Sequence, residues 1–100
     1  MTSLFTVIII MAAGVLSNPN EKAGDAHYSN RNIPEAIHYY TEALREDPDS
    51  AIVYYKRARA YLINHQYENY NRDIARALEL DPDLPKKLSN PDLTVNVEIE

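Results

Sequence analysis

Apolar residues recur at intervals of three and four positions along the middle of the chain, the spacing that places them on one face of an α-helix. Such a stripe runs through Val53, Tyr54, Ala58, Tyr61 and Leu62, with Arg57 at the same spacing, and another runs through Ile74, Ala77 and Leu78. Prolines and short polar clusters divide the region into four helical segments. The pattern predicts an all-α chain.

Helix starts and stops fit this division. Asn18-Pro19-Asn20-Glu21 has an Asn cap, Pro at the first helical position and Glu placed for a capping box, and residues 32–35 repeat this order. Asp49 or Ser50 caps a third helix, and a fourth runs from about residue 66 to residue 80. Proline cannot continue a helix, so Pro48 and Pro82 end the second and fourth.

The segments also repeat each other. "ALREDPD" in residues 43–49 corresponds to "ALELDPD" in residues 77–83, an offset of 34. The same residue occurs twice at this offset in Lys22/Lys56, Ala26/Ala60, Asn30/Asn64, Ala43/Ala77, Leu44/Leu78, Asp47/Asp81, Pro48/Pro82 and Asp49/Asp83. A period of 34 is typical of stacked helix-turn-helix units. Each Asp-Pro-Asp is then the corner that follows one helical hairpin.

Residues 17–83 resemble two tetratricopeptide repeats (TPRs). Family positions are occupied by Gly24, Ala36, Tyr40, Ala43 and Pro48 in the first unit, and by Tyr54, Ala58, Tyr61, Ala77 and Pro82 in the second. The resemblance implies two antiparallel helical hairpins stacked as a short right-handed solenoid, with an irregular C-terminal tail. The expected division is residues 1–17, the repeats 18–84 (18–50 and 51–84), and a partial cap and tail, 85–100.

Three positions depart from the family pattern. Asn20 replaces an aromatic residue, His27 replaces a tyrosine, and Tyr70 stands where a small alanine is expected between the two helices of a unit. Tyr70 therefore puts close packing of the second hairpin in question, unless the register shifts by one residue.

The two ends of the chain leave alternatives open. Residues 4–16 form an almost unbroken apolar run, too short to span a bilayer, that suits a signal peptide, a packed cap or a membrane anchor. A signal peptide would place the protein in the secretory pathway or ER lumen rather than the cytoplasm. Leu93, Val95, Val97 and Ile99 alternate with polar residues, as in a strand. This segment is interpreted as a loose tail, as an edge strand that pairs with another chain or starts a missing domain, or as a result of truncation.

Composition excludes several classes of function. A formal net charge of −5 argues against nucleic acid as a partner, and without cysteine there are no disulfides or thiolate metal sites. His27, His38 and His65 lack partners at metal-ligand spacing, and there is no glycine-rich phosphate loop. We expect no enzyme activity, no cofactor, no metal and no small-molecule substrate.

The family resemblance implies a concave groove lined by the first helix of each unit. The candidate peptide-binding residues are Glu21, Lys22, Asp25, Tyr28, Ser29, Tyr55, Lys56, Arg59 and Ile63. This face is acidic in the first unit and basic in the second, which would orient a peptide with opposite charges at its ends. Tyr28 and Tyr55 are aromatics that the stacking does not need to bury.

One activity of the family fits poorly. Co-chaperone TPRs that clamp an acidic EEVD tail use Lys and Asn where this chain has Glu21, Asp25 and Lys56. The two carboxylates would repel such a tail by on the order of 1 kcal/mol each, so the clamp is disfavoured.

Two functions remain. The first is a protein–protein interaction module of adaptor or co-chaperone type that holds a peptide or unfolded-client segment in the groove. A weaker resemblance to the opening repeats of ER-lumenal J-domain co-chaperones supports it, although the chain has no J domain. The second is an assembly element that forms homo-oligomers or docks onto other repeats through its exposed ends, around Tyr70, Ile74 and the N-terminal run.

Overall fold

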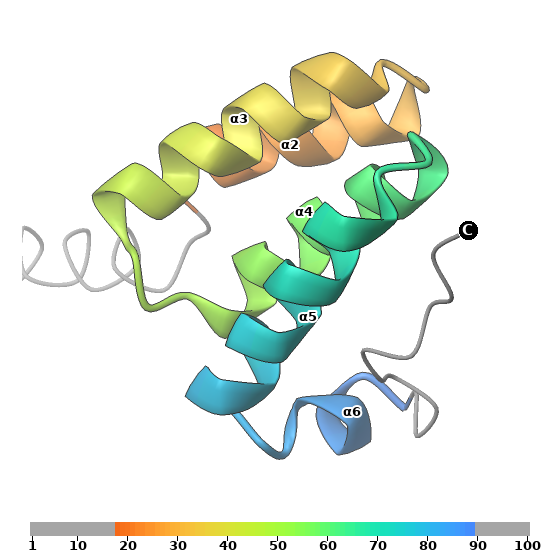
Figure 1. Ribbon diagram of the computed structural model, residues 1–100. Coiled ribbons are helices and arrows are strands. Elements are labelled where there is room, and N and C mark those ends of the chain that lie inside the picture. Colours follow the sequence, from red (N-terminus) through yellow and green to blue (C-terminus); the bar gives the residue numbers. More distant parts are fainter. Residues whose placement is uncertain (1–17, 90–100) are drawn as a thin grey trace, which may run out of the picture.

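The computed structural model describes residues 18–89, and this part of the chain is helical without any strand. The helices are α2 (Pro19–Ser29), α3 (Ile33–Glu46), α4 (Ala51–Ile63), α5 (Tyr67–Leu80) and the single turn α6 (Leu84–Lys87) (Figure 1). The prediction of an all-α chain built from helical hairpins is confirmed. The interpretations of residues 1–17 and of the strand-like tail fall outside the described residues.

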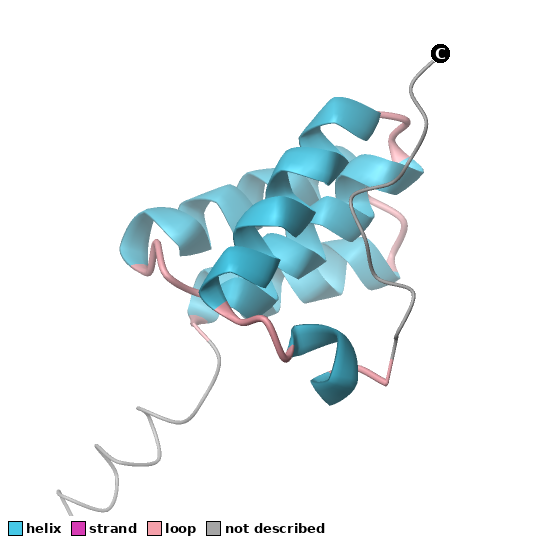
Figure 2. Ribbon diagram, turned by 60° about the horizontal axis from the view of Figure 1, so that its bottom comes forward, coloured by secondary structure: helices cyan, strands magenta, loops and turns pink. Residues whose placement is uncertain are grey.

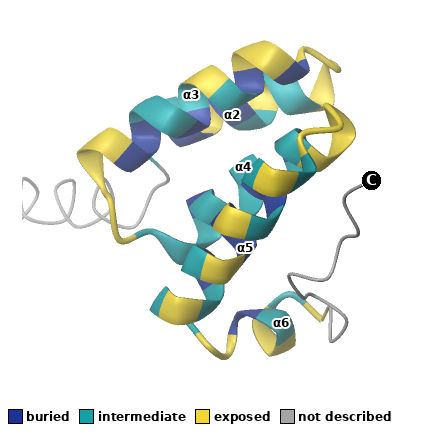
Figure 3. Cartoon of the chain, viewed as in Figure 1, coloured by how far each residue is buried: buried dark blue, intermediate teal, exposed yellow. Residues whose placement is uncertain are grey.

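The helices form two hairpins that stack side by side. Helix α2 packs on α3, α4 packs on α5, and α3 packs on α4, which joins the hairpins. Helices α3 and α5 form one layer in front of α2 and α4 (Figure 1), and loops connect the consecutive helices (Figure 2). The buried residues line the contacts between helices, while the outer faces stay exposed (Figure 3). Helices α2 and α4 therefore share one side of the molecule.

The helix starts match the predicted positions but only partly the predicted bonds. Asn18 caps α2 by accepting a hydrogen bond from the backbone N–H of Asn20 at 2.7 Å, and Ser50 rather than Asp49 caps α4. The expected capping box at Glu21 is wrong, because its carboxylate binds Lys56 of α4 instead. Asn32 precedes α3 without a capping hydrogen bond from its side chain. Position along the chain was thus easier to predict than the partner of each polar side chain.

The turn inside each hairpin has a residue with left-handed backbone conformation at the same position of the repeat. Arg31 (φ 65°) follows α2, and His65, 34 positions later, follows α4 with φ 60°. In each turn two backbone N–H groups bond back to the last carbonyls of the helix, as in a Schellman motif. Glycine is the usual residue here because a side chain is strained at positive φ. Neither turn contains glycine, so the left-handed conformation could not be predicted from the sequence pattern.

The Asp-Pro-Asp corners work as predicted. Asp47 ends α3 and accepts a hydrogen bond from the backbone N–H of Asp49, and Asp81 ends α5 and accepts one from the N–H of Asp83 at 3.1 Å. Asp81 also binds Lys87 at 2.8 Å, and this hydrogen bond holds the pKa of Asp81 below its usual value. These aspartates shape the corners and need no calcium to explain them.

Both hairpins are closely packed, but large and small side chains occupy different positions of the repeat in each. In the first hairpin, the Tyr40 ring lies against Gly24 and beside the small Ala36. The corresponding residues of the second hairpin, 34 positions later, are Ile74 for Tyr40, Ala58 for Gly24 and Tyr70 for Ala36. Tyr70 is 8% exposed and belongs to the core cluster of its hairpin. The doubt raised by Tyr70 is therefore resolved by exchange: where one hairpin has a large residue, the other has a smaller one.

Arg57 connects three helices through one buried polar cluster. Its guanidinium, on α4, donates two hydrogen bonds to Asp73 of α5, at 2.7 and 2.8 Å, and one to Thr41 of α3 at 3.2 Å. The hydrogen bonds and charge of Asp73 raise the pKa of Arg57 even though burial acts against the charged form. A two-pronged bond of this kind fixes relative orientation as well as distance. It therefore orients α5 against α4 within the second hairpin, while the single hydrogen bond to Thr41 connects this hairpin to the first.

Replacing Gly24 tests the tight approach of α2 and α3. A Cβ atom there would lie 2.5 Å from a ring carbon of Tyr40. Gly24→Ala should lower the free energy of unfolding by about 1–3 kcal/mol, because overpacking outweighs the gain of about 1 kcal/mol from helix propensity. Urea unfolding followed by circular dichroism measures the change. Ser29→Ala, at an exposed position of the same helix, should shift stability by less than about 0.5 kcal/mol, and equal effects would contradict this packing.

Candidate functional site

The predicted groove residues come from α2 and α4, which the fold brings to the same side. Within this set Glu21 is buried; Asp25, Tyr28, Tyr55, Lys56 and Arg59 are half-buried; and Lys22, Ser29 and Ile63 are exposed. The long side chains of α4 reach across to α2, so residues about 30 positions apart in the chain meet. We call this surface, formed by the facing sides of α2 and α4, the α2/α4 face.

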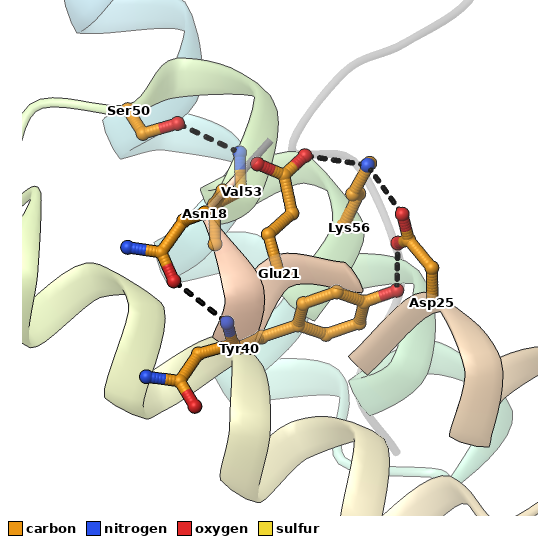
Figure 4. A network of polar contacts seen from close by, with 8 residues as sticks. Asn18, Glu21, Asp25, Tyr40, Ser50, Val53 and Lys56 are labelled. Atoms are coloured by element: carbon orange, nitrogen blue, oxygen red, sulfur yellow. Dashed lines mark hydrogen bonds and ion pairs between the residues drawn. The ribbon is translucent and has the colours of Figure 1, made fainter. Parts of the chain in front are cut away.

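A shared ammonium group is at its centre (Figure 4). Lys56 Nζ lies 2.6 Å from a Glu21 carboxylate oxygen and 3.0 Å from Oδ2 of Asp25. The other oxygen of Asp25 accepts a hydrogen bond from the Tyr40 hydroxyl at 2.7 Å. The network thus joins α2, α3 and α4.

The network shifts two pKa values upward. Burial alone would lower the pKa of Lys56, but the hydrogen bonds from Lys56 to Glu21 and Asp25 outweigh it and raise the pKa. Burial raises the pKa of the Tyr40 hydroxyl well above its usual value, and the hydrogen bond to the Asp25 carboxylate adds to this. Lys56 is therefore firmly charged and Tyr40 firmly neutral at physiological pH.

Arg59 is held differently from Lys56. Its guanidinium carbon lies 4.7 Å from the ring centre of Tyr28 and 5.2 Å from that of Tyr55, one aromatic from each helix. Its Nε is buried and has no hydrogen-bond partner among residues 18–89, and none of its nitrogens takes part in an ion pair within that range. The rings fix the position of a cation whose donors are not used by the described part of the chain.

A small open cleft of about 200 Å³ lies beside this cation. Asp25, Tyr28, Ser29, Lys56 and Arg59 line it, together with Tyr40. Five of the nine candidate residues thus meet at the cleft. Tyr55 does not line it but contacts Arg59, which does. Glu21, Lys22 and Ile63 do not line the cleft, but Glu21 binds Lys56, which does.

The arrangement changes two sequence-based expectations. The acidic and basic halves of the face do not present separate charges, because Lys56 pairs with both carboxylates of α2. The sequence also showed Tyr40 only as a residue of the repeat pattern, and its hydroxyl at the cleft was not predicted. The available signal was that the family has phenylalanine at this position, so a tyrosine there brings a hydroxyl that needs a partner.

Other chemistry finds no geometric support in the described range. Residues 18–89 contain no group of three or more His, Asp or Glu side chains placed to hold a metal ion. His27 stacks on Tyr39 with ring centres 5.1 Å apart, and His65 contacts Tyr67, so both histidines pack at the surface. None of the helices within 18–89 has the length and apolar character needed to cross a bilayer.

Comparison with known proteins identifies the fold family. The sequence model described as tetratricopeptide repeat matches residues 21–85, well over half of the chain. The chain belongs to the tetratricopeptide repeat family. This membership supports a protein–protein interaction module with protein partners.

Several larger TPR proteins resemble the chain. It is 32% identical over 71 residues to the Hsp70-Hsp90 organizing protein of Triticum aestivum, which is 71% of this chain and 12% of that protein. Identity is 34% to the DnaJ homolog subfamily C member 7 homolog of Schizosaccharomyces pombe and 34% to the small glutamine-rich tetratricopeptide repeat-containing protein 2 of Saccharomyces cerevisiae. The matches cover 74% and 59% of this chain, and 16% and 17% of those proteins. The TPR pair therefore spans only a small part of each relative.

Alkaline pH should weaken the fold through the network at Lys56. Both pKa values are raised above their ordinary 10.5 for Lys56 and 10.0 for Tyr40, so the unfolded chain releases these protons first. This stability is present below about pH 10 and is lost as the pH rises further. Melting temperatures followed by circular dichroism should fall steeply above that pH, and less steeply in Tyr40→Phe. Equal slopes in the two proteins would contradict the assignment to Tyr40.

Proposed function

We infer that the α2/α4 face binds a peptide segment of a protein partner and that the chain acts as a non-catalytic adaptor of co-chaperone type. The observation that carries this inference is the state of Arg59. Its guanidinium is positioned by two tyrosine rings beside an open cleft, yet it makes no ion pair within residues 18–89. A positioned cation beside an open cleft, with donors that the described residues do not use, favours a ligand that supplies acceptors.

The rest of the face suits an extended peptide. Tyr28 and Tyr55 offer flat, amphipathic surfaces that contact either apolar or polar side chains at low entropic cost. Main-chain carbonyl oxygens and carboxylates of a peptide are acceptors for Arg59. Charges of both signs already paired with each other keep the face close to neutral, which fits a partner that is not strongly charged.

The relatives favour a role among chaperones. One is called an Hsp70-Hsp90 organizing protein and another a DnaJ homolog, and both names describe chaperone systems. We therefore place the partner among chaperones or the unfolded clients that they handle. Because Asp25 lines the cleft and Glu21 and Asp25 together occupy Lys56, an EEVD tail bound by a cluster of cations remains disfavoured.

Assembly through the solenoid ends is the weaker alternative. Two residues expected to form the exposed end, Tyr70 and Ile74, are instead 8% and 0% exposed inside their own hairpin. They are not available for docking. The described chain exposes two large hydrophobics, Leu62 and Ile63, which lie next to each other at the end of α4.

Replacing Arg59 tests the proposed function. Peptides selected from a random displayed library on the wild-type protein should bind Arg59→Gln about tenfold or more weakly, because hydrogen bonds to a charged group contribute about 1.5–3 kcal/mol. Isothermal titration calorimetry measures the affinities. Arg45→Gln, which removes the same charge from the exposed side of α3, is the matched control and should bind as the wild type does.

Two results would contradict the proposal. In the first, the selected peptides bind Arg59→Gln and Arg45→Gln equally well. In the second, the library yields no binder, while sedimentation at millimolar concentration shows a dimer that persists. The second result would favour the assembly alternative.

A further inference from the structure

We propose that the α2/α4 face accepts one carboxylate of its peptide ligand, at Arg59, and rejects peptides with several. Glu21 and Asp25 are then specificity-determining residues, since they occupy Lys56 and withhold it from the ligand. This inference rests on the proposed function, because it names the class of peptide that the same face takes.

The two cations of the face differ in what they can offer. Lys56 donates to two carboxylates of α2, at 2.6 and 3.0 Å, so the three groups together carry one net negative charge. Arg59 has aromatic contacts alone, and its donors are unused by the described residues. The single cation free to pair with a ligand on the cleft is therefore Arg59, within residues 18–89.

Asp25 limits the cleft to one ligand carboxylate. Asp25 lines the same cleft, and both of its oxygens are engaged, one by Lys56 and the other by Tyr40. The Tyr40 hydroxyl and the Lys56 ammonium thus hold the Asp25 carboxylate in place. One ligand carboxylate pairs with Arg59, whereas a second would meet the negative trio and be repelled.

The surroundings of Arg59 also indicate which kind of peptide carboxylate fits. The guanidinium lies between two tyrosine rings, so an incoming carboxylate must approach in the remaining open direction, towards the cleft. Residues beside it on the peptide contact Tyr28 and Tyr55. We therefore expect a single Asp or Glu flanked by apolar or neutral residues.

The test compares peptide pools with different numbers of carboxylates. The probes are capped hexapeptides with zero, one, two or three Glu residues and a random mixture of apolar and neutral polar residues elsewhere. Capping removes the terminal charges, so each pool has a defined charge. Dissociation constants are measured by displacement of a fluorescent library peptide from the full chain.

The wild type should bind the one-Glu pool about tenfold or more tightly than the zero-Glu pool. A second or third Glu should bring no further gain and should weaken binding by up to about threefold. The double variant Glu21→Gln/Asp25→Asn frees Lys56 and should gain about tenfold from the second Glu. Arg59→Lys keeps the charge but loses the planar fork and should lose most of the one-Glu preference. Circular dichroism checks that each variant is folded; if the double variant is not, each single variant is measured instead.

The outcomes distinguish failure of the one-carboxylate inference from failure of the proposed peptide binding. If the wild type gains as much from a second and third Glu as the double variant, the one-carboxylate inference is overturned although peptide binding stands. The one-carboxylate inference is also overturned if all pools bind equally while Arg59→Gln still weakens binding of the fluorescent peptide. If no pool displaces the peptide and Arg59→Gln leaves its binding unchanged, the proposed function itself is contradicted.

Discussion

The sharing of one ammonium group by two carboxylates is the constraint on which the site depends. Lys56 extends from α4 to Glu21 and Asp25 of α2, and Asp25 in turn accepts a hydrogen bond from the Tyr40 hydroxyl of α3. Each hairpin has its own packing, and this network adds a polar connection between their first helices. It fixes the distance between α2 and α4 and thereby the shape of the cleft.

The same network decides the charge of the face. With Lys56 18% exposed and its partner Glu21 11% exposed, the pair is shielded more than an ordinary surface ion pair, and a ligand cannot easily displace it. Arg59 lines the same cleft but contacts two aromatic rings, and its hydrogen-bond donors are not used by residues 18–89. Two cations three positions apart on one helix thus have separate roles. One stabilises the arrangement of the helices, and the other is the cation to which the proposed function assigns the ligand.

Much of the fold could be predicted because it depends on local patterns. The 34-residue period, the Asp-Pro-Asp corners and the apolar stripes located every helix from α2 to α5. The exchange of size between Gly24, Tyr40 and their counterparts Ala58 and Ile74 could not be seen, because it depends on contacts between helices. The sequence predicted the candidate groove residues as a set, and the network among Glu21, Asp25, Lys56 and Tyr40 could not be predicted. Charge in a sequence does not show which side chains pair, and the pairing decided which cation remained free.

A double-mutant cycle between Lys56 and Glu21 tests the central claim most directly. Free energies of unfolding are measured for the wild type, Lys56→Met, Glu21→Gln and the double variant, with Lys22 in place of Lys56 as the control, since Lys22 is exposed beside Glu21 without bonding to it. We predict a coupling of about 1–3 kcal/mol for Lys56 and about zero for Lys22. Additivity within about 0.3 kcal/mol for both pairs would contradict the shared ammonium as the constraint that organises the site.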